Sequence, residues 1–236
     1  MKILEARNIN KKYVESKGIF GVNKEKNILM DFNFEINRGE IVGIVGNSGC
    51  GKSTFAKCLV NIESPDSGVI VIDGEVVYEK IKDSKKENIN KYSNLYVKKK
   101  IQIIMQDQYS ALNPKIKVGK SVLDALLIHE TDMSIDDAMS KVIEYFELCG
   151  LKESDIEKYP HQFSGGQLQK VSIARALILE PKIVVCDEIT SALDVSVQAS
   201  ILNLMLDLKD KLNLTYIFIS HDKDVLDCIC DRKIFM

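Results

Sequence analysis

The sequence has no stretch that approaches the roughly 18 consecutive apolar residues of a transmembrane helix. Its formal net charge is −2, so it lacks the overall basic field that is typical of nucleic-acid-binding proteins. The N-terminal residues MKILEARNI lack the apolar core of a signal peptide, and no internal repeat is present. With 45% hydrophobic and 28% charged residues, the composition is that of an ordinary globular domain.

The cysteines follow no zinc-binding pattern. Six are scattered through the chain, which favours reduced thiols over a disulfide framework. Cys228 and Cys230 are separated by one residue and could hold a metal. Packing is the favoured interpretation of this pair, because no further ligands are nearby in the sequence.

Short apolar runs alternate with helical stretches, a pattern typical of an α/β fold with a mainly parallel sheet. The near-continuous apolar runs predict buried parallel strands at 41–46, 182–187 and 215–221. Residues 3–9 and 32–36 alternate instead, which predicts an antiparallel layer with one exposed side. Another strand is expected at residues 68–73.

The middle of the chain changes character. A lysine-rich stretch at 79–100 lacks apolar periodicity and is expected to be a solvated insertion. Residues 110–160 show a helical pattern that includes a capped amphipathic helix from Ser134 to Gly150. We therefore expect one domain over 1–236, in which a helical subdomain at 107–166 interrupts an α/β core. That core is expected to comprise residues 1–106 and 167–236.

A glycine-rich loop follows the first buried strand. The segment GNSGCGKST places Gly46, Gly51, Lys52 and Ser53 at the spacing of a phosphate-binding loop, between a strand and a helical run. The glycines allow backbone N–H groups to turn inward around phosphate oxygens. Lys52 would contribute positive charge toward the β- and γ-phosphates, and the Ser53 hydroxyl would bind Mg²⁺. The sequence therefore predicts a P-loop nucleoside triphosphatase.

Two further strands end in polar side chains. The segment KIVVCDE offers Asp187 for the magnesium ion and Glu188 to polarise an attacking water. A solvated acid pair would be the simpler interpretation if the phosphate loop were absent. His221 ends the next apolar strand, at the edge of the sheet where ligands bind, and could contact the γ-phosphate. His129 and His161 are expected to be surface or packing residues.

These residues resemble the ATP-binding subunits of ABC transporters, in order and over nearly the whole chain. The motifs that carry the resemblance are GNSGCGKST as the Walker A loop, KIVVCDE as Walker B, FSGGQ as the signature and SALD as the D-loop. Gln106 matches the Q-loop glutamine, His221 the switch histidine and Tyr13 the aromatic residue that stacks on adenine. The phrases MQDQYSALNP, YPHQFSGGQ and DEITSALDVSVQASILNL are similar to the dipeptide, oligopeptide and nickel importers.

The resemblance implies a site with ATP and Mg²⁺ as cofactors. Its expected nucleotide-binding residues are Tyr13, Gly46, Asn47, Ser48, Gly49, Cys50, Gly51, Lys52, Ser53, Thr54 and Gln106. Its expected magnesium ligands are Ser53, Gln106 and Asp187, and its expected catalytic residues are Glu188 and His221. The residues expected to contact a second ATP, held by a partner, are Ser164, Gly165, Gly166 and Gln167, with Asp194 in the D-loop.

The resemblance also implies partners. Two ATPase subunits of this family pack head to tail and sandwich ATP, and a sister subunit is expected here in preference to a second copy. Two membrane permeases and, indirectly, an extracellular solute-binding protein complete the expected assembly, without nucleic acid. The expected location is peripheral, at the cytoplasmic face of a bacterial membrane.

The sequence departs from the family pattern at a few positions. Ile189 replaces the usual proline after Glu188, and Leu168 and Lys170 replace arginines after the signature. Peptides and nickel both remain open as solutes. A non-transport ABC ATPase, acting in DNA repair or translation, is the alternative function, although no coiled-coil insertion, zinc module or second cassette is visible. A module that no longer hydrolyses ATP is a third possibility, and Glu188 and His221 argue against it.

Overall fold

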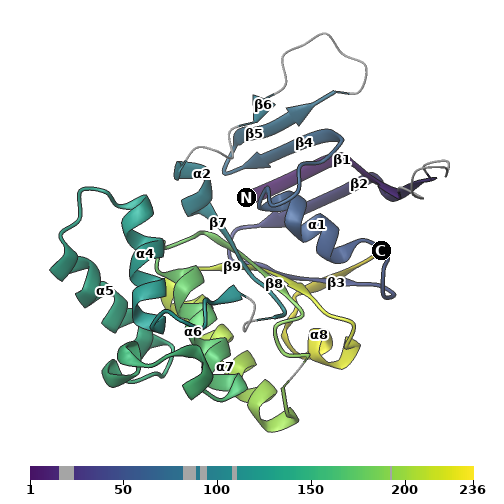
Figure 1. Cartoon of the computed structure of the whole chain (residues 1–236). Helices are drawn as coiled ribbons and strands as arrows, with labels where there is room; N and C mark the ends of the chain where they lie inside the picture. The colour runs from purple at the N-terminus through teal and green to yellow at the C-terminus, as the bar shows by residue number, and fades with distance from the viewer. Residues whose placement is uncertain (16–23, 82–88, 91–94, 108–110, 192) are drawn as a thin grey trace.

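The computed structural model describes residues 1–15, 24–81, 89–90, 95–107, 111–191 and 193–236. Its strands form two sheets (Figure 1). One sheet is antiparallel, with the order β2-β1-β4-β5-β6, and the other is parallel, with the order β10-β3-β9-β8-β7. The antiparallel strands are β1 (Lys2–Glu15), β2 (Lys24–Asn37), β4 (Ser67–Ile72), β5 (Glu75–Lys80) and β6 (Ile89–Asn90). The parallel strands are β3 (Ile41–Val45), β7 (Ile101–Ile104), β8 (Ile183–Asp187), β9 (Thr215–Ile219) and β10 (Arg232–Phe235).

The central strands of the parallel sheet, β3, β8 and β9, are buried on both faces, as their apolar runs predict. Along β8, Ile183 and Val185 pack into the hydrophobic cluster shared with α1 and the antiparallel sheet. Val184 and Cys186 pack into the cluster formed with the helices on the opposite face. Successive side chains of a strand point to opposite faces of the sheet. Because an apolar cluster covers each face, the residues that point to either face must be apolar, and the sequence shows no alternation. The α/β class, the parallel sheet and the antiparallel layer are therefore confirmed.

The helices differ in what they cover. Figure 1 shows α1 between the two sheets, and α4 to α7 gathered below and beside the parallel sheet. The helices are α1 (Lys52–Leu59), α2 (Leu95–Lys100), α4 (Val118–His129), α5 (Ile135–Leu148), α6 (Gly165–Leu177), α7 (Val195–Leu212) and α8 (Lys223–Ile229). Two short 3₁₀ helices, η1 (Glu153–Glu157) and η2 (Pro160–Gln162), lie between α5 and α6. The division at 107–166 stays a prediction.

The capped helix predicted after Ser134 is present as α5. The Ser134 hydroxyl accepts a hydrogen bond from the Asp137 amide at 3.1 Å, which satisfies one of the free N–H groups at the helix start. Gly150 follows the helix with a φ of +68°, a conformation that glycine adopts at little cost.

The lysine-rich stretch at 79–100 is not wholly a solvated insertion. Its last six residues form α2, in which Val97 is completely buried. Lys100 is also buried, and its ammonium group lies 4.2 Å from the centre of the Tyr96 ring. Six helical residues are too few to show a period, so this burial depends on tertiary contacts. Parts of the stretch, at 82–88 and 91–94, lie outside the described residues.

The Asp73 carboxylate is one link between the two sheets. Asp73, in the turn between β4 and β5, accepts hydrogen bonds from Lys182 at 2.6 Å, Arg38 at 2.8 Å and Lys100 at 3.3 Å. Lys182 precedes β8 and Lys100 precedes β7, so both cations belong to the parallel layer. The hydrogen bond from Lys182 is the main reason why the pKa of Asp73 lies below its ordinary value.

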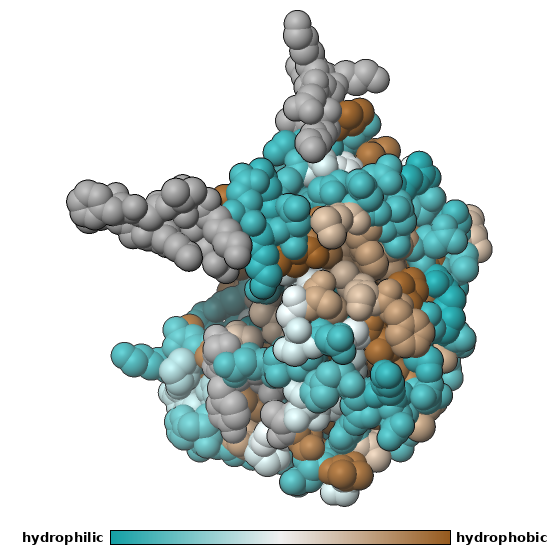
Figure 2. All heavy atoms as spheres, turned by 90° about the vertical axis from the view of Figure 1, so that its right-hand side faces the viewer, coloured by the Kyte–Doolittle hydropathy of each residue, from teal (hydrophilic) through white to brown (hydrophobic). Residues whose placement is uncertain are grey.

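None of the helices in the described part of the chain has the length and apolar character needed to cross a bilayer. Figure 2 shows that hydrophilic residues cover most of the face that carries the C-terminal end, with hydrophobic residues gathered across its middle. The six cysteines are free thiols, and the described residues hold no group of three or more His, Cys, Asp or Glu side chains that could bind a metal ion.

Candidate active site

The phosphate loop connects β3 to α1. Asn47, Ser48 and Gly49 are exposed in the turn, whereas Gly51 is buried directly before the helix. Gly51 has a φ of +113°, and a Cβ atom there would lie 3.1 Å from the carbonyl oxygen of Ile28 on β2. Both the backbone conformation and the lack of space therefore require glycine at this position. The loop opens toward solvent at the N-terminus of α1, where free N–H groups favour anions.

Lys52 is held inside the loop that it follows. Its Nζ atom donates to the carbonyl oxygens of Gly46 at 2.8 Å and Asn47 at 3.0 Å, and it lies 3.8 Å from the Cys50 sulfur. Only 6% of the residue is exposed. Among the described residues, this buried ammonium donates its hydrogen bonds to backbone carbonyls, so it can form a stronger, charge-assisted hydrogen bond with an entering anion. The loop and Lys52 therefore fit a polyphosphate.

Ser53 and Asp187 meet although they are distant in sequence. The Ser53 hydroxyl donates to the Asp187 carboxylate at 3.0 Å, between the first turn of α1 and the end of β8. Burial raises the pKa of Asp187, and the hydrogen bond from Ser53 opposes this effect. A nearby cation would offset the cost of a buried carboxylate, and hydroxyl and carboxylate oxygens are ligands that Mg²⁺ prefers. The pair fits the predicted magnesium site.

Glu188 and His221 form a second pair beside the first. His221 Nδ1 lies 3.3 Å from Glu188 Oε1, so the ends of β8 and β9 bring the two residues together. Glu188 has a φ of +49°, and its amide donates to the Ile219 carbonyl at 2.9 Å. Glu188 directly follows the last residue of β8, and its positive φ takes the chain out of the strand. Ile189, in place of the family's proline, is buried.

Gln106 does not join the proposed magnesium ligands in this structure. Its amide nitrogen donates to the Ser191 hydroxyl at 3.3 Å, and that hydroxyl donates to the Glu188 carbonyl at 3.0 Å. The glutamine is thus linked to the backbone of Glu188. Sequence reasoning places Ser191 only within the SALD motif and does not anticipate this link.

Tyr13 lies against the first turn of α1. Its hydroxyl oxygen is 3.5 Å from Thr54 Oγ1, and it donates a hydrogen bond to the carboxylate of Glu63. The residue is 37% exposed, so part of its ring remains open. Burial of the hydroxyl, assisted by Glu63, raises the pKa of Tyr13. Sequence reasoning did not find Glu63, because no motif connects residues 50 positions apart.

The signature turn caps α6. The Gln167 amide donates to the Ser164 hydroxyl at 3.3 Å, and the Ser164 amide donates to the Gln167 side chain at 3.1 Å. This reciprocal pair fixes the start of the helix. A Cβ atom on Gly166 would lie 2.5 Å from the Cγ1 atom of Val197 on α7, so the two helices approach closely there. A hollow of about 240 Å³ in front of the turn could admit a ligand group.

Asp194 is the N-cap residue of α7, and its side chain makes no capping hydrogen bond. It lies exposed beside the signature turn, because the following helix contributes Val197 to the hollow that contains Ser164 and Gly166. This arrangement leaves the Asp194 carboxylate accessible to a partner.

Comparison with known proteins places this geometry in a family. The ABC transporter family matches residues 29–191. The dipeptide transport ATP-binding protein DppF of Haemophilus influenzae is 42% identical over 99% of this chain and 68% of its own length. The oligopeptide transport ATP-binding protein OppF of Bacillus subtilis is 36% identical over 98% of this chain and 71% of its own length.

Solved structures of ABC cassettes also resemble this chain. The ATP-binding cassette MJ0796, in a dimeric post-hydrolysis state bound to ADP and Pi, superposes with a TM-score of 0.81 and 27% identity. That match covers 99% of this chain and 94% of the cassette. The protein cbiO1 of Clostridium perfringens, part of the transporter complex cbiONQ, gives a TM-score of 0.79 with 28% identity over 100% and 84% of the two chains. This chain belongs to the ABC transporter family of ATP-binding and ATP-hydrolysing cassettes.

Proposed function

We propose that this chain is the ATPase subunit that energises an importer for peptides and that it uses Mg²⁺. The observation that carries the proposal is the convergence of two pairs at one sheet edge. Ser53 with Asp187 offers a cation site, and Glu188 with His221 offers a base, directly beside the phosphate loop. Peptides are favoured over nickel because both curated relatives described above are named for peptide transport.

The residues of the chain divide the chemistry of γ-phosphate transfer. Lys52 and the loop N–H groups hold the phosphates. Phosphoryl transfer depends on positioning and charge stabilisation of the transferred group, and it requires little covalent chemistry from the protein. When bound, Mg²⁺ would be held by Ser53 and Asp187, with Gln106 as the third proposed ligand, and would neutralise phosphate charge. Glu188 orients and polarises the attacking water. His221, 3.3 Å away, holds the Glu188 carboxylate in place and contacts the γ-phosphate.

The signature turn is assigned to a different ATP molecule. Ser164, Gly165 and Gly166 would present the N-terminus of α6 to a γ-phosphate held by the loop of a second ATPase subunit. A site divided in this way forms only when two subunits close, so hydrolysis depends on assembly. We propose a sister ATPase as that second subunit, two permeases in the membrane, and an external solute-binding protein that delivers the peptide. The chain would be peripheral, at the cytoplasmic face of a bacterial membrane.

The test of the catalytic assignment is Glu188→Gln in the assembled complex. Loss of a general base is expected to reduce turnover by about 10²- to 10⁴-fold, while ATP affinity is retained. Glu180→Gln is a matched control, because Glu180 also has a positive φ but pairs with Lys141, away from the site. Wild-type turnover in the Glu188→Gln complex would refute the assignment.

The transport assignment requires a separate test. Affinity purification of the chain from detergent-solubilised membranes is expected to recover two permeases and a second ATPase. A solute-binding protein that belongs to the same system should bind peptides in calorimetry. A chain recovered with ribosomes or DNA-repair proteins instead would support the non-transport alternative and refute the proposal.

A further inference from the structure

The connection between α1 and β4, residues 60–66, is fixed to the helix that carries the phosphate loop. The amides of Ile62 and Glu63 both donate to the carbonyl oxygen of Lys57, at 2.9 Å and 3.3 Å. Lys57 lies in the last turn of α1, and Lys52 and Ser53 lie in its first turn. Because a short helix is a rigid unit, the backbone of Glu63 keeps a fixed relation to the phosphate-binding residues.

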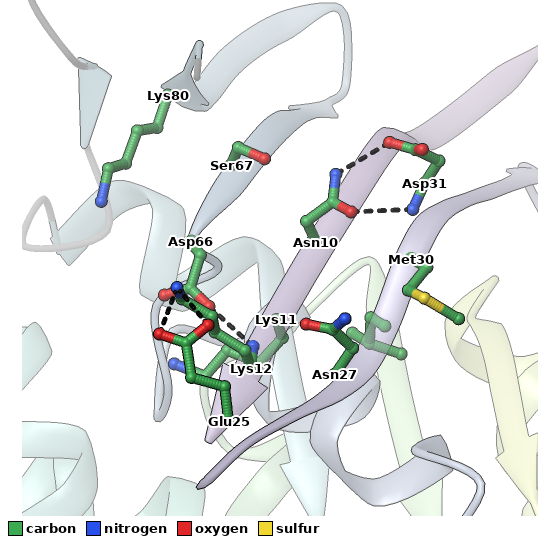
Figure 3. Close-up of a pocket in the computed structure, with 11 residues that line it drawn as sticks. Asn10, Lys11, Lys12, Glu25, Asn27, Met30, Asp31, Asp66, Ser67 and Lys80 are labelled. Carbon is green, nitrogen blue, oxygen red and sulfur yellow. Dashed lines mark hydrogen bonds and ion pairs between the residues drawn. The ribbon is translucent and has the colours of Figure 1, made fainter. Parts of the chain in front are cut away.

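The same connection is also fixed to β1. The Asp66 amide donates to the Asn10 carbonyl at 2.8 Å, and the Asp66 carboxylate accepts from the Lys12 amide at 2.7 Å. Figure 3 shows this contact between Asp66 and Lys12. Lys11 adds a hydrogen bond from its ammonium group to the Ser64 carbonyl at 2.8 Å. Three hydrogen bonds thus hold β1 to this connection without any contribution from the Tyr13 side chain.

The contact between Tyr13 and Glu63 completes this arrangement. The Tyr13 hydroxyl donates to one oxygen of the Glu63 carboxylate, and the Lys57 ammonium lies 3.4 Å from the other oxygen. Burial opposes ionisation of Glu63, but the hydrogen bonds from Tyr13 and Lys57 outweigh it and hold its pKa below the ordinary value. The ionised Glu63 carboxylate therefore accepts a charge-assisted hydrogen bond from the Tyr13 hydroxyl, which keeps its proton.

A purely structural role would be to tie the connection to β1. The three hydrogen bonds made by Asp66 and Lys11 already serve that purpose, so the contact with Glu63 is not needed for it. The contact holds Tyr13 only by the tip of its ring, and the residue remains 37% exposed beside Thr54. The geometry therefore orders the aromatic ring and leaves it available to a ligand that binds at the start of α1.

We propose that Glu63 is a positioning residue for the nucleotide base, which acts by holding the Tyr13 ring in the orientation that stacks on adenine. This inference rests on the proposed role of Tyr13 as the adenine contact. A ring that is ordered before binding does not lose rotamer freedom on binding. That saving corresponds to about a two- to tenfold gain in ATP affinity.

The experiment compares a ligand with a base and a ligand without one. ATP and inorganic tripolyphosphate are titrated into the full chain and its variants by calorimetry, in the presence of magnesium chloride. Glu63→Ala and Tyr13→Phe are each expected to weaken ATP binding by about two- to tenfold and to leave tripolyphosphate binding unchanged. Glu63→Gln should restore most of the ATP affinity, because its amide oxygen still accepts the hydrogen bond.

A double-mutant cycle tests whether Glu63 changes ATP affinity through the Tyr13 hydroxyl. If Glu63 acts through the hydroxyl of Tyr13, Glu63→Ala causes no further loss of ATP affinity in the Tyr13→Phe background. Glu25→Ala is the matched control, because Glu25 pairs with Lys12, the neighbouring residue of β1, at 2.9 Å (Figure 3). Glu25 lines a hollow of about 720 Å³ that contains none of the predicted site residues, so this variant should bind ATP normally.

Four results would overturn the inference. Equal weakening of ATP and tripolyphosphate by Glu63→Ala would mean that the change distorts the phosphate loop. Additive effects in the cycle would mean that Glu63 acts independently of Tyr13. Unchanged ATP affinity in Glu63→Ala, together with weakened affinity in Tyr13→Ala, would refute only the positioning role. Unchanged affinity in both variants would also refute the proposed adenine contact.

Discussion

Replacement of Gly166 by alanine should destabilise the chain when residue 197 is valine and stabilise it when residue 197 is alanine. The added Cβ atom would lie 2.5 Å from Val197 Cγ1, about an ångström inside van der Waals contact. Valine in a helix has one strongly preferred χ1 rotamer, so this methyl group cannot easily turn away. The resulting overlap is expected to cost about 2 kcal/mol.

A second contribution has the opposite sign. Alanine is favoured over glycine inside a helix by about 1 kcal/mol, and Gly166 is the second residue of α6. Gly166→Ala should therefore destabilise the wild-type chain by about 1 kcal/mol net, which lowers Tm by about 2–4 °C for a domain of this size. In a Val197→Ala background the next atom is 3.8 Å away, in ordinary contact. There the same change should stabilise by about 1 kcal/mol.

The assay is urea unfolding of the four members of this double-mutant cycle, followed by far-ultraviolet circular dichroism. The expected coupling free energy is about 2 kcal/mol, and Gly166→Ala should lower the midpoint in one background and raise it in the other. Gly165→Ala is the matched control, because its Cβ atom would lie 3.5 Å from Leu193 Cδ2, an ordinary contact. Equal effects of Gly166→Ala in both backgrounds would refute the steric argument.

Two further predictions concern charged groups. Asp73→Asn should cost about 2 kcal/mol, since Lys100 and Lys182 lose their shared carboxylate, and lower Tm by about 4–8 °C. Because the folded-state pKa of Asp73 is depressed, this difference should be complete above about pH 4 and vanish as pH falls through the folded-state pKa. An equal Tm at pH 7 would contradict it. Lys52→Ala should weaken ATP binding at least about tenfold in fluorescence titrations, and unchanged affinity would contradict the loop assignment.

The sequence predicts most reliably where local pattern and tertiary environment agree. The runs at 41–46, 182–187 and 215–221 became β3, β8 and β9, because strands buried on both faces require continuous apolar residues. The capping residues of α5 are also local, and its start at Ile135 was predictable from Ser134. The phosphate loop is encoded within nine consecutive residues, so its position between β3 and α1 needed no knowledge of distant contacts.

Other features depend on contacts that no local pattern contains. β1 and β2 extend far beyond the alternating segments predicted for them, because each strand continues as long as its partner does. β7 and β10 were not predicted, since four residues are too few to establish a period. The link from Gln106 through Ser191 to Glu188 and the contact of Tyr13 with Glu63 each join segments far apart in sequence.

The two-sided burial of β8 has a consequence for which genetic changes the protein can tolerate. Alternation places Asp187 on the side of α1, where it meets Ser53, and the chain turns at Glu188 toward His221. Removal of one residue from within β8 would move every following side chain to the opposite face of the sheet. Glu188 would then take the position of Asp187 beside Ser53, and Asp187 would take the position of Cys186 on the opposite face. Point substitutions among the apolar residues of β8 should be tolerated far more often than a single-codon deletion, however small the deleted side chain.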